Sequence, residues 1–329
     1  MTTSSPLLIC ITPVRNEAWV LHAFLKITSL WADYIIIADQ GSTDGSIEIA
    51  KGYSKVILID NSNQNFNEDE RQKLLINRAR EIDGDKILFG FDADEILTAN
   101  FNSTNDWTKI INSKPGDVFW LKWAQIDPNL KHYYESDKVF FPWIFHDDNI
   151  EPHQNYVRNI HSMRIPYPID EKQTYYIDEF KVMHFSHLNP LRVLSKSRFY
   201  KFVDWELNRR SVVKLSRTYS IKPFDDVKYQ IPNSFIRYEK EPKFHIFDYI
   251  VVDENRFWYD DYIVSRINKS NILNVKKLDI WDETFMGICP IDCRSFIDRI
   301  VHGYLYITRA YSSKKIIKLF DKFLMKIGY

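Results

Sequence analysis

Short apolar runs alternate with amphipathic segments over the first hundred residues of the chain. The runs cover residues 7–14, 34–39, 55–60 and 86–91, and Ile, Leu, Val and Phe dominate them. Continuous apolar runs of this length are typical of strands that are buried on both faces. Residues 15–30 and 67–82, which lie between runs, carry apolar side chains at helical spacing. This alternation predicts an α/β fold with a mostly parallel sheet flanked by helices.

Polar side chains follow three of these four predicted strands. Residues 15–17 (Arg-Asn-Glu) come after the first strand, Asp39 ends the second, and residues 92–95 (Asp-Ala-Asp-Glu) come after the fourth. Ligands of doubly wound sheets bind beyond the carboxyl ends of the strands. We therefore expect these three clusters to meet at one edge of the sheet and to form the functional site.

The acidic cluster "DADE" indicates metal chemistry. In extended backbone Asp92 and Asp94 point to the same side, and carboxylate oxygens suit Mg²⁺ or Mn²⁺. The alternative is a solvated turn whose acids cap a helix that begins near Thr98. Three acids within four residues also repel one another, so we expect a positive group beside them.

Composition narrows the function further. The 329 residues contain 44 Lys+Arg and 44 Asp+Glu, and this balance argues against a nucleic-acid partner. Three cysteines, Cys10, Cys289 and Cys293, do not complete a zinc site. The N-terminal segment lacks the basic start of a signal peptide, and no apolar stretch approaches the ~20 residues that cross a bilayer. A cytoplasmic location is the expectation.

Three segments together resemble a known family. "TPVRNEA", "IIIADQGSTDGS" and "FGFDADE" are similar to three consecutive signatures of family 2 glycosyltransferases of the GT-A fold, over residues 7–100. The D-x-D-E form resembles a subfamily that modifies lipopolysaccharide or other surface glycans. The resemblance implies a GT-A (Rossmann-like) catalytic domain and a metal-dependent sugar transfer. The donor would be a nucleotide sugar, preferably a UDP-sugar, and the acceptor a glycan or a lipid-linked glycan, with inversion at the anomeric carbon.

The resemblance also implies roles for individual residues. Residues that would contact the nucleotide sugar are Pro13, Arg15, Glu17, Asp39, Arg71, Asp92 and Ala93. Asp39 would accept a hydrogen bond from the base, since a carboxylate only accepts. Asp92 and Asp94 would bind Mn²⁺ or Mg²⁺. For Arg71 the alternative is a surface arginine paired with Glu68 or Asp69.

Two later segments, "IHSMRIPYP" and "KVMHFSHLNPLRVLSKSRFYKF", resemble the histidine segments of the same family. His184 is the preferred third metal ligand, His187 is its alternative, and His161 is held in reserve for an acceptor or structural role. Lys196 and Arg198 would contact phosphates or belong to a solvated face.

The catalytic base is the main departure from the family pattern. An inverting enzyme needs a carboxylate near the acceptor hydroxyl, yet Ser162 stands where relatives carry an acid. Asp148 and Glu151 are the preferred candidates, Asp147 and Glu135 are further ones, and the alternative for the segment around them is an exposed acidic loop.

We expect a catalytic domain over residues 1–215, with a nucleotide-binding half up to about residue 100 and an acceptor half after it. Residues 216–329 would form a mainly helical appendage. Its tail, residues 309–329, predicts a basic amphipathic helix. Such a helix suits peripheral contact with the inner face of the membrane. The alternative is a helix docked on the core with its lysines in solvent.

Two other functions fit parts of this pattern. A sugar-phosphate nucleotidyltransferase also places acids on a doubly wound sheet, but it would carry a glycine-rich loop after the first strand, and "TPVRNEA" has no glycine. An inactive nucleotide-sugar-binding module fits the missing base, whereas the intact Asp39, Asp92 and Asp94 argue against it.

Overall fold

The structure is a computed structural model that describes residues 5–62, 67–136, 138–150, 161–166, 173–221, 227–251, 256–269, 272–289 and 292–329. The chain divides into two compact units. The N-terminal unit comprises Met1–Leu188 and Asp226–Val252, and the C-terminal unit comprises Asn189–Asp225 and Asp253–Tyr329. The expected boundary after residue 215 lies inside a helix, Val212–Tyr219, and the division falls after Leu188 instead.

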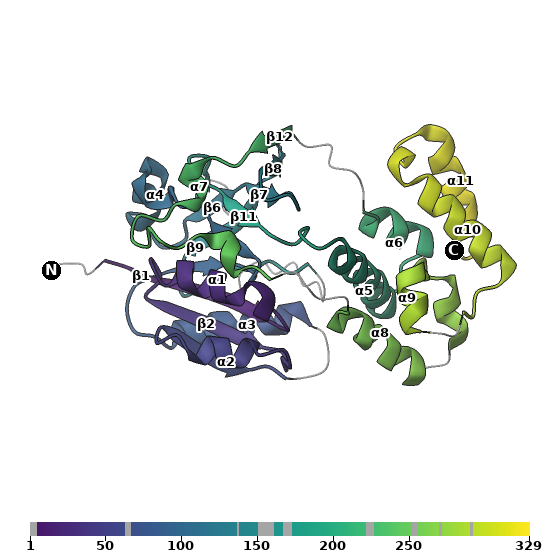
Figure 1. Cartoon of the computed structure of the whole chain (residues 1–329), viewed down its shortest axis with the longest axis horizontal. Coiled ribbons are helices and arrows are strands. Elements are labelled where there is room, and N and C mark those ends of the chain that lie inside the picture. The colour runs from purple at the N-terminus through teal and green to yellow at the C-terminus, as the bar shows by residue number, and fades with distance from the viewer. Residues whose placement is uncertain are drawn as a thin grey trace. The chain divides into compact units, whose positions relative to one another are not determined.

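A sheet of seven described strands forms the centre of the N-terminal unit, in the order β10-β6-β9-β4-β1-β2-β3 (Figure 1). Neighbours pair in parallel except around β9, which runs antiparallel to both β4 and β6. The strands are β1 (Leu7–Val14), β2 (Tyr34–Asp39), β3 (Val56–Asp60), β4 (Lys86–Gly90), β6 (Val118–Leu121), β9 (Phe141–His146) and β10 (Thr174–Tyr176).

Helices cover both faces of this sheet. Alternate residues of the parallel strands, such as Cys10 and Phe89, pack in one cluster with Phe24 of α1 (Ala18–Thr28). The residues between them, such as Ile9 and Leu88, pack in a second cluster with Leu75 of α3 (Glu68–Arg80). Burial on both faces explains why these strands are continuously apolar. A short helix, α2 (Ser46–Lys51), lies between β2 and β3 in the sequence.

The strand order creates a switch point beside β1. The chain passes from β1 to β2 and β3 on one side of β1, and then crosses to β4 on the other side. Val14 pairs with Asp39, and Ile11 pairs with Gly90, so the carboxyl ends of three strands meet at one edge. Crevices at such switch points are the usual ligand sites of open α/β sheets. The predicted convergence of the strand ends is therefore present.

A second sheet of five described strands has the order β12-β8-β7-β11-β5. Its strands are β5 (Glu95–Leu97), β7 (Trp123–Ile126), β8 (His132–Glu135), β11 (Val182–His184) and β12 (Val227–Gln230). The antiparallel pairing of β11 with β5 sets His184 opposite Glu95. Short helices complete the unit: η1 (Phe101–Ser103), α4 (Asn105–Ile111), α7 (Asn233–Ile236) and η3 (Ile246–Tyr249).

In its described part the C-terminal unit consists of helices. They are α5 (Pro190–Asn208), α6 (Val212–Tyr219), α8 (Trp258–Lys269), η4 (Ile272–Lys277), α9 (Glu283–Ile288), α10 (Phe296–Ile307), η5 (Arg309–Tyr311) and α11 (Lys315–Lys326). The predicted α/β class, with a mostly parallel flanked sheet and a helical C-terminal part, is confirmed. No helix within the described ranges is both long and apolar enough to cross a bilayer.

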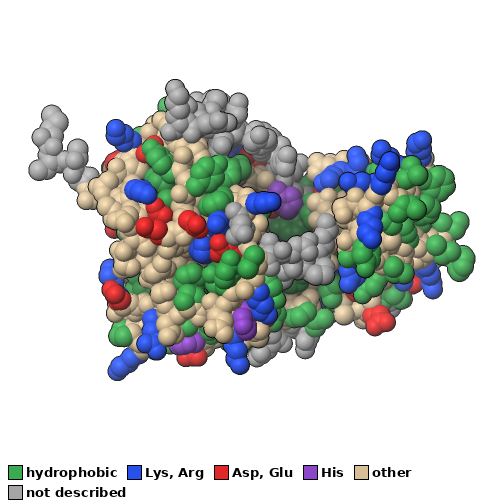
Figure 2. All heavy atoms as spheres, turned by 90° about the horizontal axis from the view of Figure 1, so that it is seen from above, with side chains coloured by type: hydrophobic (Ala, Val, Ile, Leu, Met, Phe, Trp, Pro, Cys, Tyr) green, Lys and Arg blue, Asp and Glu red, His purple; other side chains and the backbone are tan. Residues whose placement is uncertain are grey.

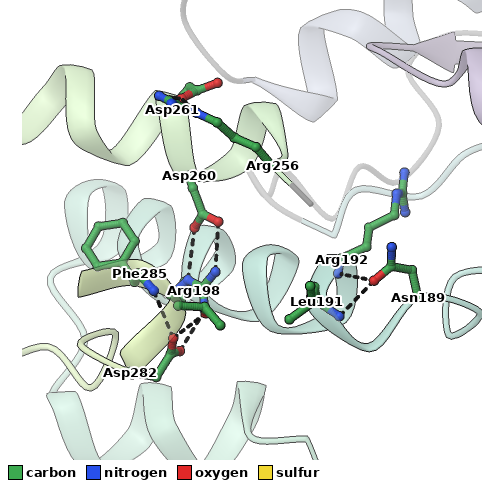
Figure 3. A network of polar contacts seen from close by, with 10 residues as sticks. Asn189, Leu191, Arg192, Arg198, Arg256, Asp260, Asp261, Asp282 and Phe285 are labelled. Atoms are coloured by element: carbon green, nitrogen blue, oxygen red, sulfur yellow. Dashed lines mark hydrogen bonds and ion pairs between the residues drawn. The ribbon is translucent and has the colours of Figure 1, made fainter. Parts of the chain in front are cut away.

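Arg198 lies in the interior of the C-terminal unit (Figure 3). Its guanidinium makes a two-pronged ion pair with Asp260, at 2.9 and 2.7 Å, and a further one with Asp282 at 2.6 Å. Both predictions for Arg198, a phosphate contact and a solvated face, are wrong. A buried charge needs fixed partners, and two aspartates from later helices supply them.

Candidate functional site

The loops after β1 and β2 hold each other through hydrogen bonds. The Asn16 backbone N–H donates to Ser42 Oγ at 2.9 Å, and Asn16 Oδ1 accepts from the Thr43 N–H at 2.7 Å. The N–H of Glu17 donates to Ser46 Oγ at 2.9 Å. Asn16 has a φ of 53°, a left-handed conformation that Asn tolerates better than most residues. Much of the polarity in these two segments therefore builds the edge of the site rather than contacting a ligand.

Asp39 presents a buried carboxylate at this edge. One oxygen, Oδ2, accepts from the N–H groups of Gly41 and Ser42 at 2.9 and 3.0 Å. The other oxygen, Oδ1, is buried and has no hydrogen-bond partner in the described part of the chain. A buried acceptor without a partner is costly, so Oδ1 is suited to a donor that arrives with a ligand.

Arg71 reaches the same strand end from α3. Its Nη1 donates to Oε1 of Gln40, the residue after Asp39, at 3.2 Å. Of the alternative partners, Asp69 pairs with Lys73 at 2.7 Å, and Glu68 accepts from the Ser162 N–H at 3.1 Å. Arg71 thus contacts the residue that follows Asp39.

The positive group expected beside the acidic cluster is Arg164. Its Nη2 lies 2.5 Å from Oδ2 of Asp92, and its Nη1 donates to Oε2 of Glu95. The negative charges around Arg164 raise the pKa of its guanidinium above the usual range, against the opposing effect of burial. Arg164 comes from the histidine segment "IHSMRIPYP", in which the sequence analysis assigned no role to it.

Glu95 organises the tryptophans of the site. Its Oε1 accepts from Trp123 Nε1 at 2.9 Å, and its Oε2 accepts from Trp143 Nε1 at 3.2 Å and from the Asp92 N–H at 3.0 Å. Complete burial raises the pKa of Glu95 to about 7, although the charge of Arg164 opposes this rise. The last acid of "DADE" therefore anchors two tryptophans, the Asp92 backbone and Arg164.

Gly90 allows Arg164 to come this close. A Cβ on Gly90 would lie 2.9 Å from both the Cβ and the carbonyl oxygen of Arg164, and 3.0 Å from Cγ2 of Ile165. Glycine inside a buried strand often marks such a close approach of another segment.

Asp94 and His184 meet on the other side of the cluster. Asp94 Oδ2 lies 3.7 Å from His184 Nε2, and both residues are buried. The His184 ring stacks on Trp123, with centroids 4.6 Å apart and planes inclined by 20°. Asp92 is turned to Arg164 instead. Among the residues that the structure describes, no three His, Cys, Asp or Glu side chains gather as a metal-holding group.

These two residues fit a divalent ion as part of its coordination sphere. Mg²⁺ and related ions are often held by one or two protein ligands, while substrate phosphates and water fill the remaining positions. A carboxylate and an imidazole are both accepted by Mn²⁺.

The remaining nucleotide-binding candidates lie along β1 and β4. Pro13 is half-buried in β1 opposite Ala38, and Arg15 follows that strand directly. Glu17 precedes the first residue of α1 and accepts from Trp19 Nε1 at 2.6 Å. Ala93 is buried in the hydrophobic core, so its methyl group faces away from solvent.

The preferred base candidates do not join this edge. The pairing of β9 with β4 sets His146 opposite Ile87, and the Asp147 N–H donates to the Lys86 carbonyl. Asp147 and Asp148 therefore lie at the amino end of β4, roughly 17 Å from "DADE" at about 3.3 Å per residue. Asp147 is bound to Arg80, and Asp148 accepts from the Ile150 N–H. Asp148, a candidate base, therefore lies away from this edge, because the preceding strand runs antiparallel to β4.

Other candidates have fixed partners or lie outside the described residues. Glu135 is buried between Lys122 and Lys181, at 3.4 and 3.0 Å. Glu151 lies outside the described residues. His161 is exposed, with a φ of 63°, and His187 Nδ1 lies 3.0 Å from Ser186 Oγ.

Comparisons with known proteins give structural neighbours only. No protein family matches this sequence, and no curated protein does. Glucosyl-3-phosphoglycerate synthase from Mycobacterium tuberculosis, in complex with Mn²⁺, UDP and glucosyl-3-phosphoglycerate, is similar over 38% of this chain and 46% of its own, at 18% identity and a TM-score of 0.28. The same enzyme with phosphoglyceric acid aligns over 36% and 44%, with a TM-score of 0.27.

A 4-diphosphocytidyl-2C-methyl-D-erythritol synthase aligns over 44% of this chain and 74% of its own, at 10% identity and a TM-score of 0.30. The chain thus matches less than half of the first neighbour's length. Similarity of this extent carries no conclusion about activity.

Proposed function

We propose that this protein is a GT-A-type glycosyltransferase that moves a sugar from a nucleotide sugar, preferably a UDP-sugar, to a glycan or lipid-linked acceptor with inversion. The observation that carries the proposal is the edge beside β1. There Asp39 ends β2, and one of its buried oxygens has no partner among the described residues. Asp94, which lies beside His184, follows β4 on the other side of β1. The three sequence signatures supply the family to which this arrangement is compared.

In this proposal the nucleotide lies across the end of β1. β2 and β4 flank β1, so their ends are about 10 Å apart at roughly 4.8 Å per strand. The base donates a hydrogen bond to Asp39 Oδ1, and Arg71 adds positive charge beside it. Arg15 and Glu17, on the loop after β1, flank the ribose. The diphosphate is then directed toward the acidic cluster.

Asp94 and His184 would hold a Mn²⁺ or Mg²⁺ ion together with diphosphate oxygens and water. When bound, such an ion neutralises the charge that develops on a departing nucleoside diphosphate. Arg164 keeps Asp92 and Glu95 neutralised and in place, and Trp123 fixes the plane of the His184 ring. These residues therefore pre-organise the two ligands before a donor arrives.

Surface glycan or lipopolysaccharide assembly on lipid-linked acceptors would place the protein at the inner face of the membrane. A carboxylate base has to come from a residue other than Asp147 or Asp148, which lie at the far end of β4.

The test is thermal unfolding with UDP, GDP and CMP, each with and without Mn²⁺, followed by donor hydrolysis with the matching sugar nucleotides. A ligand that binds only the folded state raises its melting temperature by mass action. We expect the largest rise with UDP and Mn²⁺ together, and none of this synergy in Asp94→Asn. The M. tuberculosis synthase, crystallised with the same pair, suggests these as the first ligands to try.

Two results would contradict the proposal. Diphosphate release from a nucleoside triphosphate and a sugar phosphate, without transfer from a sugar nucleotide, would identify a nucleotidyltransferase. A Mn²⁺-dependent rise with UDP but no turnover of any donor would identify an inactive binding module. Asp148→Asn is the matched control, because it removes an acid that follows β9 and lies beside the opposite end of β4.

A further inference from the structure

The apolar stripe of α11 faces away from the body of the C-terminal unit. Of its six members only Leu324 is buried. Ile316 and Leu319 are 73% and 69% exposed, and the others are exposed as well: Phe320, Phe323 and Ile327. A helix that docked its apolar stripe on the core would show the reverse pattern. Within this unit α11 therefore rests on Asp321 and Leu324 and leaves most of its apolar surface in solvent.

The preceding helix, α10, continues this surface. Its buried side chains are Asp298, Val301, His302 and Leu305. Phe296, Ile300 and Ile307 recur on the opposite face, and each is more than half exposed. The two helices contact each other through the rings of Tyr304 and Phe320, whose centroids are 4.7 Å apart. We name the combined surface the C-terminal apolar face: Phe296, Ile297, Ile300, Ile307, Ile316, Leu319, Phe320, Phe323 and Ile327.

The exposed charged side chains of α10 and α11 themselves are basic. From Ser295 to the last residue the chain has two acids, and both are buried and bonded. Asp298 accepts from Tyr329 Oη at 2.6 Å, and Asp321 pairs with Arg217 at 2.8 Å. The exposed lysines are Lys314, Lys315, Lys318, Lys322 and Lys326. Arg299 is also exposed, and it pairs with Asp292 at 3.0 Å. Figure 2 shows hydrophobic and basic side chains gathered together over the C-terminal helices.

We propose that the C-terminal apolar face docks on an anionic lipid bilayer. Helices that lie in a membrane interface combine an exposed apolar face with Lys or Arg beside it, and each basic residue gains energy from anionic headgroups. Tyr306 and Tyr311, both more than half exposed, add the amphipathic aromatic rings that favour this depth. The docking involves both helices, so the surface is wider than the amphipathic tail alone.

The positive charge beside the C-terminal apolar face favours an anionic bilayer over a second copy of the chain as its partner. A symmetric dimer presents the same patch from both partners. Its lysines would then surround one interface with no exposed acid on either helix to neutralise them. An anionic bilayer supplies the missing negative charge.

The experiment is flotation of the full chain with vesicles of phosphatidylcholine alone and of phosphatidylcholine mixed with phosphatidylglycerol. We expect binding to the mixed vesicles that weakens as salt rises, and little binding to the neutral ones. Lys318→Gln with Lys322→Gln should weaken this binding about thirtyfold. Leu319→Ser with Phe323→Ser should weaken it more than about a hundredfold, because two apolar side chains no longer enter the interface.

Matched controls keep the test specific. Tyr176→Ser removes a 64% exposed ring from the N-terminal unit, and Lys51→Gln removes an exposed lysine from α2, so both should bind vesicles like the original protein. Melting curves show whether the variants stay folded. The proposal would be overturned by vesicle binding that does not depend on lipid charge. It would also be overturned by binding that persists when Lys318, Leu319, Lys322 and Phe323 are all substituted. A dimer in lipid-free solution that Leu319→Ser with Phe323→Ser converts to monomer, while vesicle binding is absent throughout, would overturn it as well.

Discussion

Aspartates lie at both ends of strand β4, and their partners differ. Asp147 follows β9 and lies beside the amino end of β4, whereas Asp92 and Asp94 follow its carboxyl end. At the amino end Asp147 has no exposed side-chain surface, and its two oxygens accept from Nε and Nη2 of Arg80. At the carboxyl end Asp92 shares Arg164 with Glu95, and Asp94 lies 3.7 Å from His184. One strand over, Asp39 keeps a buried oxygen with no partner among the described residues.

The difference separates acids that complete the fold from acids that retain binding capacity. A carboxylate bound in two places by one guanidinium has little left to offer a ligand. Asp94, which lies beside the His184 imidazole, and Asp39, whose Oδ1 has no hydrogen-bond partner among the described residues, keep the capacity to bind a ligand. In the sequence, acids of both kinds directly follow an apolar strand. Only their hydrogen-bond and ion-pair partners in the structure distinguish them.

The largest effect we expect is on turnover in Asp94→Asn. Loss of a ligand that holds the ion should lower metal-dependent turnover about a thousandfold, since such ions contribute several kcal/mol to charge stabilisation. Steady-state transfer or donor hydrolysis at saturating Mn²⁺ measures this. Asp148→Asn should stay close to the original rate. Equal losses of turnover in Asp94→Asn and Asp148→Asn would show that the acids at the two ends of β4 do not differ in function.

Next in size is the stability of Asp147→Asn. Removing one partner of a buried ion pair leaves Arg80 uncompensated, and this should cost about 3 kcal/mol of unfolding free energy. Urea unfolding followed by tryptophan fluorescence measures the change. The response of the melting temperature to UDP and Mn²⁺ should remain in the folded variant. A stable Asp147→Asn protein without that response would assign Asp147 to the site instead.

Asp39→Asn should weaken nucleotide binding while the protein stays folded. The amide oxygen still accepts from the N–H groups of the turn, but a hydrogen bond to a charged acceptor is lost, worth roughly 2 kcal/mol or about thirtyfold in Kd. Isothermal titration with UDP measures it. Asp60→Asn is the matched control, because Asp60 ends the neighbouring strand β3 in solvent. Unchanged affinity in Asp39→Asn would remove the base contact from the proposal.

The smallest expected effect is that of Gly90→Ala. The added methyl group meets Arg164 at 2.9 Å, so the segment over β4 has to shift, at a cost of about 1 to 2 kcal/mol. The shift should also reduce the stabilisation by UDP with Mn²⁺, measured by the melting temperature. Gly287→Ala, where a Cβ meets nothing within 4 Å, should show neither change. If Gly90→Ala had the stability of the original protein and the same response to UDP with Mn²⁺, the Arg164 segment would be able to shift without a cost in free energy.

The fold could be predicted from the sequence because its signal is local. Strands β1, β2 and β4 of the central sheet are buried on both faces, so their apolar runs stand out from the helical pattern between them. The strand ends at Asp39 and Asp92 follow directly from those runs. The need for a positive group near "DADE" also follows from charge alone.

The identity of that group could not be predicted, because Arg164 lies about seventy residues away and approaches through tertiary contacts. The one local hint is Gly90, a glycine inside an apolar strand. The place of Asp148 could not be predicted for a related reason: the strand before it, β9, runs antiparallel to β4, and strand direction is not encoded in an apolar run. The fixed partners of Arg198 and Glu135 are equally non-local.

The pairing of β11 with β5 has a consequence for how a binding site on this scaffold could diversify. Main-chain hydrogen bonds, which any residue can make, hold positions 184 and 95 in register, and the Phe185 N–H donates to the Asp94 carbonyl at 2.9 Å. The spacing between the two candidate ligands is thus a property of the backbone. Replacing the imidazole by a carboxylate or an amide would exchange one donor type for another without rebuilding the scaffold, so preference among divalent ions can drift by single substitutions.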